Sequence, residues 1–122
     1  MRPVDLQRRL VLAAGLLLGA QMVSAGEQPL SVVALRYLVP GHSPERIEAA
    51  LTIPLEKTLG ELPRVSEIWS NTGEGFVVVD IHIEGGATQH DVETVERHVE
   101  KLTFAPDIVI TSRTTVLAPR SQ

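Results

Sequence analysis

The stretch VSEIWSNTGEGFVVVDIHIE, residues 65–84, decides the fold. In its second half, Val or Ile stands at every odd position from 77 to 83, and polar residues stand at 80, 82 and 84. A period of two is typical of a β-strand with one buried face. Glycines at 73 and 75 supply the positive φ values of a tight turn. The stretch therefore predicts a hairpin of strands 65–71 and 76–84, joined by residues 72–75.

This alternation assigns the side chains of the hairpin to two faces. The residues expected to face the core are Val77, Val79, Ile81 and Ile83, and those expected to face away are Phe76, Val78, Asp80, His82 and Glu84. Counting back from the turn gives the cross-strand pairs on the face away from the core: Asn71 with Phe76, Trp69 with Val78, Glu67 with Asp80 and Val65 with His82.

Helical patterns flank the hairpin on both sides. Before it, a β-rich segment over residues 30–38 is followed by Ser43-Pro44-Glu45, a compact helix start. Apolar residues then recur every three or four positions up to residue 62, with Pro54 inside the stripe, which predicts a kink or break near Thr52. After the hairpin, Thr88 is the expected cap of a second helix with an apolar seam, and a last strand is expected over residues 108–116.

The element order is thus βαββαβ. It predicts the α+β class and, within that class, the ferredoxin-like arrangement, a four-stranded antiparallel sheet with both helices on one face. Because this arrangement serves many unrelated functions, function has to be inferred from particular residues.

Residues 1–25 have the pattern of a cleavable signal peptide. Three arginines outweigh one aspartate in residues 1–9, a charge-free apolar run spans residues 10–23, and small residues precede the expected cut after Ala25. The run is shorter than the about 20 residues of a transmembrane helix. The alternatives are an uncleaved anchor or a buried first helix. We expect a periplasmic protein with one small soluble domain, residues 26–122, and no stable membrane insertion after cleavage.

Charge and cysteine content exclude several classes of protein. The leader holds three of the 11 Lys and Arg and one of the 15 Asp and Glu, so the rest of the chain has a net charge of −6. Such a surface repels phosphate backbones, so no nucleic-acid partner is expected. The sequence contains no cysteine, which leaves no disulfide and no thiol nucleophile. Because no catalytic triad or carboxylate pair can be argued from spacing, we expect no enzyme and no cofactor.

Residues 40–75, PGHSPERIEAALTIPLEKTLGELPRVSEIWSNTGEG, contain a series of spaced motifs. The motifs are Pro40-Gly41, Ser43-Pro44-Glu45 and Glu48, then Pro54-Leu55-Glu56, then Leu62-Pro63 and Val65, then Ile68, Ser70 and Gly75. In this order they resemble the first periplasmic porter subdomain of resistance-nodulation-division (RND) efflux transporters. The resemblance implies the same βαββαβ fold over residues 30–116.

Departures from the family pattern limit what this resemblance implies. Arg64 stands where the family usually has glycine, and Gly86-Ala87-Thr88 replaces the usual Gly-Thr-Asp. A full transporter has transmembrane helices, a proton-relay carboxylate and pockets between several porter subdomains, and this sequence has no counterpart of them. The resemblance therefore implies a protein that does not pump but contacts a partner, either an RND efflux complex or a second copy in a homo-oligomer.

Val65, Trp69, Phe76 and Val78 form the candidate interaction face. They share the sheet face that no expected helix covers, and exposed apolar clusters of this kind mark contact sites. The alternatives are that the register is off by one residue or that the terminal segments cover this face.

Glu67, Asp80 and His82 form a candidate site for a divalent metal such as zinc on the same face. Alternate residues of a strand are about 7 Å apart, so three ligands reach one ion only if the strand bends. The alternative is a solvated face or one salt-bridged to Arg36 or Arg113. One alternative to the contact role is therefore a small metal or ligand carrier linked to efflux. A separate alternative is a truncated transporter remnant.

Overall fold

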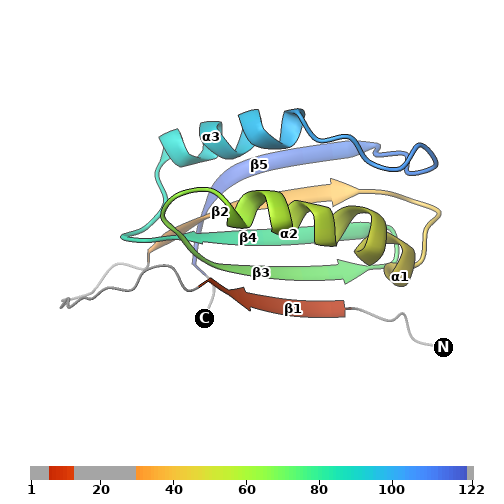
Figure 1. Ribbon diagram of the computed structural model, residues 1–122, viewed down its shortest axis with the longest axis horizontal. Helices are drawn as coiled ribbons and strands as arrows, with labels where there is room; N and C mark the ends of the chain where they lie inside the picture. Colours follow the sequence, from red (N-terminus) through yellow and green to blue (C-terminus); the bar gives the residue numbers. More distant parts are fainter. Residues whose placement is uncertain (1–5, 13–29, 121–122) are drawn as a thin grey trace.

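The computed structural model describes residues 6–12 and 30–120. Five strands form one antiparallel sheet in the order β1-β3-β4-β2-β5 (Figure 1). The strands are β1 Leu6–Val11, β2 Ser31–Leu38, β3 Val65–Gly73, β4 Phe76–Ile83 and β5 Ser112–Pro119. The predicted α+β class is confirmed. The expected count of four strands is wrong, because residues 6–11 pair with β3 and add a strand at that edge.

The first strand comes from the segment that the sequence assigns to a leader. The remainder of that leader, with the expected cleavage site after Ala25, lies outside the described residues. Removal of residues 1–25 therefore stays a prediction.

Two helical stretches lie on one side of the sheet (Figure 1). The first consists of α1 Pro44–Ile47, η1 Glu48–Thr52 and α2 Ile53–Gly60, and the second is α3 Gln89–Glu100. Both expected caps are present, since Ser43 accepts a hydrogen bond from the Arg46 N–H at 3.2 Å and Thr88 forms a capping box with Asp91. No helix in the described ranges is long and apolar enough to cross a bilayer.

A π-turn lies inside the first helical stretch. At its end the N–H of Ile53 donates to the carbonyl of Glu48, a span of five residues. Pro54 follows directly, and its missing N–H removes one further α-helical hydrogen bond. The irregularity predicted near Thr52 is thus a one-residue expansion of the turn, through which the helix continues to Gly60.

The core fills the space between the helices and the sheet. Its members form one cluster of buried apolar side chains from both layers. The inward set predicted for β4 is confirmed: Val77, Val79 and Ile81 are completely buried and Ile83 is 7% exposed. They pack with helix residues that include Leu51, Leu55, Leu59, Val95 and Val99.

The register of the hairpin differs from the predicted one by two residues. Asn71 lies opposite Val78, and Trp69 lies opposite Asp80. The strands extend further than expected, leaving a two-residue turn in which Gly75 has a φ of 83°. Because the side-chain period of a strand is two, a shift of two residues keeps each side chain on its predicted face.

Val65 faces the core, contrary to its prediction as part of the interaction face. The pairing shifts between Val65 and Glu67, so Ser66 is an extra residue on β3. Such a bulge reverses the alternation of the residues before it. Val65 consequently lies opposite Ile83, is only 3% exposed and belongs to the core cluster.

Candidate functional site

The outer face, defined as the sheet surface away from the helices, holds the other three residues of the predicted interaction face. Trp69 on β3 and Phe76 and Val78 on β4 are each partly exposed. Leu38 on β2 lies opposite Phe76 and is 42% exposed, and Val116 on β5 is 50% exposed. We call Trp69, Phe76, Val78 and Leu38 the outer patch. Both described helical stretches lie on the opposite side of the sheet (Figure 1).

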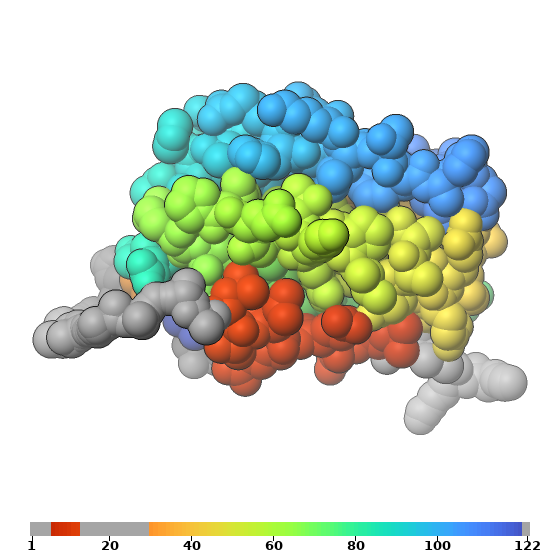
Figure 2. Space-filling view, in the orientation of Figure 1, coloured from red at the N-terminus to blue at the C-terminus, as the bar shows by residue number. Residues whose placement is uncertain are grey.

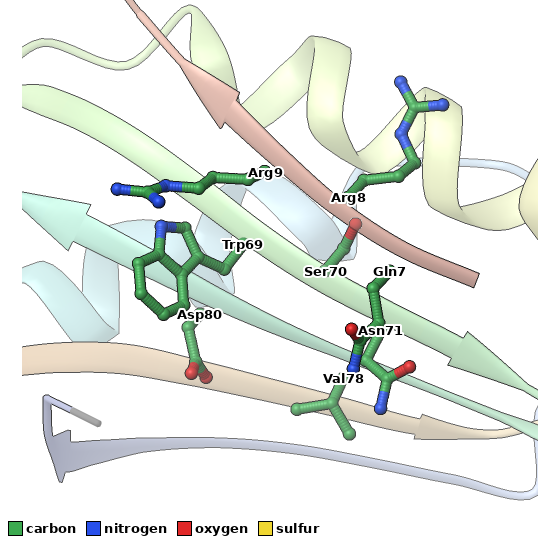
Figure 3. A pocket seen from close by; sticks show the side chains of 8 residues that line it. All are labelled: Gln7, Arg8, Arg9, Trp69, Ser70, Asn71, Val78 and Asp80. Atoms are coloured by element: carbon green, nitrogen blue, oxygen red, sulfur yellow. The ribbon is translucent and has the colours of Figure 1, made fainter. Parts of the chain in front are cut away.

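A hollow of about 540 Å³ opens on the outer face beside Trp69. Three strands line it with side chains that include Gln7, Arg9, Trp69, Asn71, Val78 and Asp80 (Figure 3). A hollow with an apolar wall and charged borders suits a protein side chain that has both apolar and polar atoms.

Trp69 contacts a cation and an imidazole ring. The guanidinium carbon of Arg9 lies 4.8 Å from the centre of the indole ring, and the ring centres of Trp69 and His82 are 4.9 Å apart. Arg9 also forms an ion pair with Glu67. The indole N–H is buried and lies close enough to the carboxylate of Glu67 to help lower the pKa of that group.

Glu67, Asp80 and His82 are not brought together as three ligands. His82 lies opposite Glu67, whereas Asp80 lies opposite Trp69. Among residues 6–12 and 30–120, no group of three or more His, Asp or Glu is placed so that it could hold a metal ion. Instead, Glu67 pairs with Arg9, and the ring of His82 lies against that of Trp69 at an angle of 34°.

The pKa values of these three groups are shifted in different directions. Burial lowers the pKa of His82 and raises the pKa of Asp80. Burial also opposes ionisation of Glu67, but hydrogen bonds from Arg9 and Trp69 and the charge of Arg9 outweigh it, so the pKa of Glu67 is lowered. At neutral pH, His82 is therefore uncharged and Glu67 is ionised, which suits stacking and ion pairing.

A second polar cluster lies on the inner side of the sheet, next to the first helical stretch. The side chains of Glu48 and Glu56 are only 14% and 4% exposed. Ser70 donates a hydrogen bond to Glu56 at 2.6 Å, and Thr72 donates one to Glu48 at 3.3 Å. Arg8 places Nη1 2.8 Å from Glu48 and Nε 3.2 Å from Glu56. One guanidinium from β1 thus bridges two carboxylates of the helix.

The π-turn explains why both carboxylates face the same strand. Eight residues of regular α-helix turn through about 800°, which would place Glu48 and Glu56 about 80° apart around the axis. The extra residue of the π-turn removes about 100° of this rotation, so the two side chains end about 20° apart. Both contact Arg8 of β1, and β1 lies beside the first helical stretch in the space-filling view (Figure 2).

Arg8 and Arg9 belong to the predicted leader, and their contacts were not predictable from the sequence. Arg8 points toward the helix, and Arg9 lies beside Trp69 (Figure 3). A period of two does run through residues 6–12, with leucine at 6, 10 and 12, and Leu10 and Leu12 pack against the core. The signal is hidden because the apolar run of the leader begins at Leu10.

No protein-family model, no curated protein and no solved structure matches the chain. The resemblance of residues 40–75 to an RND porter subdomain therefore stays a prediction. The features of this molecule that bear on function are the outer patch and the carboxylate pair bridged by Arg8.

Proposed function

We propose that this protein is an exported, non-enzymatic domain, similar to an RND porter subdomain, that acts by contact with another protein. In this proposal residues 1–25 are the leader, and the chain that begins at Gly26 works in the periplasm. The contact surface is the outer patch. The partner is an RND efflux assembly or a second copy of the chain.

The observation that carries this proposal is the apolar outer patch. A sheet with helices on one side normally shows polar residues to water on its other side. Here Trp69, Phe76, Val78 and Leu38 occupy such positions, and Val116 lies further along the same face. Tryptophan is among the residues that contribute most to binding at protein interfaces.

Charged residues at the border of the patch indicate the chemistry of the contact. Arg36 is exposed and lies opposite Val78, and Asp80 lies opposite Trp69. An apolar centre with a charged rim is the usual anatomy of a protein interface. We therefore expect a partner surface with an apolar or aromatic anchor and polar groups around it.

Two features of the fold support the likeness to a porter subdomain. Without β1, the strand order would be β3-β4-β2-β5 and the element order βαββαβ, which supports the ferredoxin-like arrangement that the resemblance implies. In addition, Glu48, Glu56 and Ser70, three residues of the matching motifs, belong to one buried polar cluster. The motif residues therefore have a shared structural role in this chain.

Trp69→Asp tests the contact role. A carboxylate at this position would have to lose its hydration under an apolar partner surface, which is costly. We expect the affinity to fall by at least about 30-fold, the scale of a central interface residue. Pull-down with a solubilised RND efflux assembly and sedimentation velocity of the protein alone measure the two candidate associations.

Ile53→Asp is the matched control. Ile53 is 45% exposed, close to the value for Leu38, but it belongs to the helical layer. Its substitution should leave association unchanged. Unchanged association of a folded Trp69→Asp protein would contradict the proposal, and so would an equal loss in the control.

A further inference from the structure

We propose that the edge of β3, together with Glu48 and Glu56, is an acceptor site for an extended segment of a partner protein. The segment would have an arginine between aliphatic residues at alternate positions. In the full chain, residues 6–12 occupy this site. This inference goes beyond the contact role of the outer patch. It rests on the proposed cleavage after Ala25, which frees the edge of β3 when residues 6–12 leave.

Backbone pairing defines the length and direction of the site. β1 runs antiparallel to β3 over six residue pairs, from Leu6 opposite Thr72 to Val11 opposite Glu67. The N–H of Leu12 extends the ladder to the carbonyl of Ser66 at 3.0 Å. Since β3 pairs with β4 on its other side, loss of β1 leaves a row of unpaired backbone groups on β3. Such an edge is a template for another extended chain.

Apolar contacts define which side chains the segment needs. Leu10 and Leu12 pack against the core, and Leu12 fills the space beside Gly60, where it lies 3.5 Å from the position of an added Cβ. These two residues alternate with outward-facing ones, as in any strand. An occupant therefore needs aliphatic side chains at the same alternate positions.

The carboxylate pair defines the charge that the segment needs. Without Arg8, Glu48 and Glu56 would face the open edge with only hydroxyl donors, such as those of Thr72 and Ser70, beside them. An occupant that covers these two carboxylates takes them out of water, and carboxylates shielded without a cation are costly, so the site favours a positively charged occupant. Contact with two separate carboxylates through Nε and Nη1 suits the fork of a guanidinium better than an ammonium group.

The required segment is more readily supplied by a different protein than by a second copy. A second cleaved copy no longer has residues 6–12. Its other edge strand, β5, has Arg113 on the inner face, but this arginine already lies 3.0 Å from Glu96 of α3. We therefore assign the site to a partner protein with an exposed arginine-containing strand or tail.

Binding of a labelled peptide, residues 4–12 (VDLQRRLVL), to the full chain tests this inference. Arg8→Asp with Leu10→Asp in the chain places two carboxylates at inward positions and releases β1. We expect this variant to bind the peptide at least about 100-fold more tightly than the wild-type chain, whose own strand competes at an effective concentration in the millimolar range. Fluorescence anisotropy measures both affinities.

Two peptide variants distinguish recognition by the carboxylate pair from a general effect of positive charge on binding. Arg8→Gln in the peptide should weaken binding by at least about 30-fold, as expected when a buried charge loses its partner. Arg9→Gln, which removes the same charge from the outward side, should weaken it by no more than about fivefold. Equal losses from the two peptides would overturn the inference.

Cleaving the wild-type full chain after Ala25 in vitro keeps the test decisive if the double variant does not fold. The peptide should then displace the cleaved fragment and remain bound, and Glu56→Gln should weaken this binding. The inference is overturned if the fragment leaves and no peptide binds to the folded remainder. It is also overturned if the wild-type chain is a dimer that exchanges residues 6–12 between copies.

Failure of this inference is distinguishable from failure of the proposed function. Loss of peptide binding leaves the test of the outer patch unaffected, because that test depends on Trp69.

Discussion

Arg8 lies between two carboxylates that are largely shielded from water in the full chain. Arg8→Gln would leave Glu48 and Glu56 without their shared cation. Because the cost of an unpaired buried charge is large, we expect the free energy of unfolding of the full chain to fall by about 2–4 kcal/mol. Urea denaturation of the full chain measures this change.

Arg9 provides the matched control at the neighbouring position. Its side chain is 63% exposed, so its ion pair with Glu67 and its contact with Trp69 are screened by water. Arg9→Gln should cost no more than about 1 kcal/mol. Equal costs for the two substitutions would show that Arg8 does not neutralise a buried pair.

His82 makes the stability of the protein depend on pH. Burial holds its pKa below the usual 6.5, against the opposite influence of Glu67 and Asp80 and with that of Arg120 and Arg9. Above pH 6.5 the imidazole is neutral in both the folded and the unfolded chain. Below that pH the unfolded chain binds the proton more readily, so the free energy of unfolding should fall as pH decreases, by at most about 1.4 kcal/mol per unit.

Denaturation between pH 7.5 and 5.5 checks this expectation. His82→Gln should flatten the dependence in that range. His90→Gln, at an exposed position of α3, should keep the wild-type slope. A slope that persists in the His82→Gln protein would contradict the assignment.

The turn between α2 and β3 contains a left-handed residue that is not glycine. Arg64 has a φ of 72°, a left-handed conformation that costs a residue with a side chain about 1–2 kcal/mol. Its guanidinium offsets this cost by contacts with Asp91 at 3.2 Å and with the carbonyl of Glu84 at 3.1 Å. The contacts link this turn to the start of α3.

Two substitutions separate backbone strain from side-chain contacts in this turn. Arg64→Gly removes both, so its unfolding free energy should lie within about 0.5 kcal/mol of the wild type. Arg64→Ala keeps the strain and loses the contacts, so it should be destabilised by about 1 kcal/mol or more. Thermal or urea denaturation checks the order, and an alanine variant as stable as the glycine variant would contradict it.

Elements with a strong local pattern were predictable from the sequence. The alternation of Val77 to Ile83 placed β4 and its faces correctly, and the caps at Ser43 and Thr88 marked both helix starts. Each of these signals depends on residues within a few positions of one another. The outward positions of Trp69, Phe76 and Val78 followed from the same alternation.

Features that depend on distant contacts or on one extra residue were not predictable. The bulge at Ser66 reversed the face of Val65, and nothing in the local pattern indicates it. Arg8 meets Glu48 across 40 residues of sequence, and the π-turn that aligns Glu48 with Glu56 changes the helical phase by a single residue. The leader pattern also concealed β1.

At the scale of the whole molecule, one short segment covers both candidate surfaces. Successive residues of β1 point to opposite faces of the sheet, Arg9 toward Trp69 on the outer face and Arg8 toward the carboxylate pair on the inner one (Figure 3). Loss of residues 1–25 would therefore uncover Trp69 and open the β3 edge in the same step. In this account, export produces the form of the protein that binds partners.

The N-terminus of the mature chain distinguishes a cleaved form from one that keeps β1. Intact-mass measurement and N-terminal sequencing of the protein recovered from the periplasm identify the first residue of the mature chain. The account predicts a chain that begins at Gly26 and lacks Leu6–Leu12. A periplasmic chain that retains these residues, with β1 still paired to β3, would contradict it.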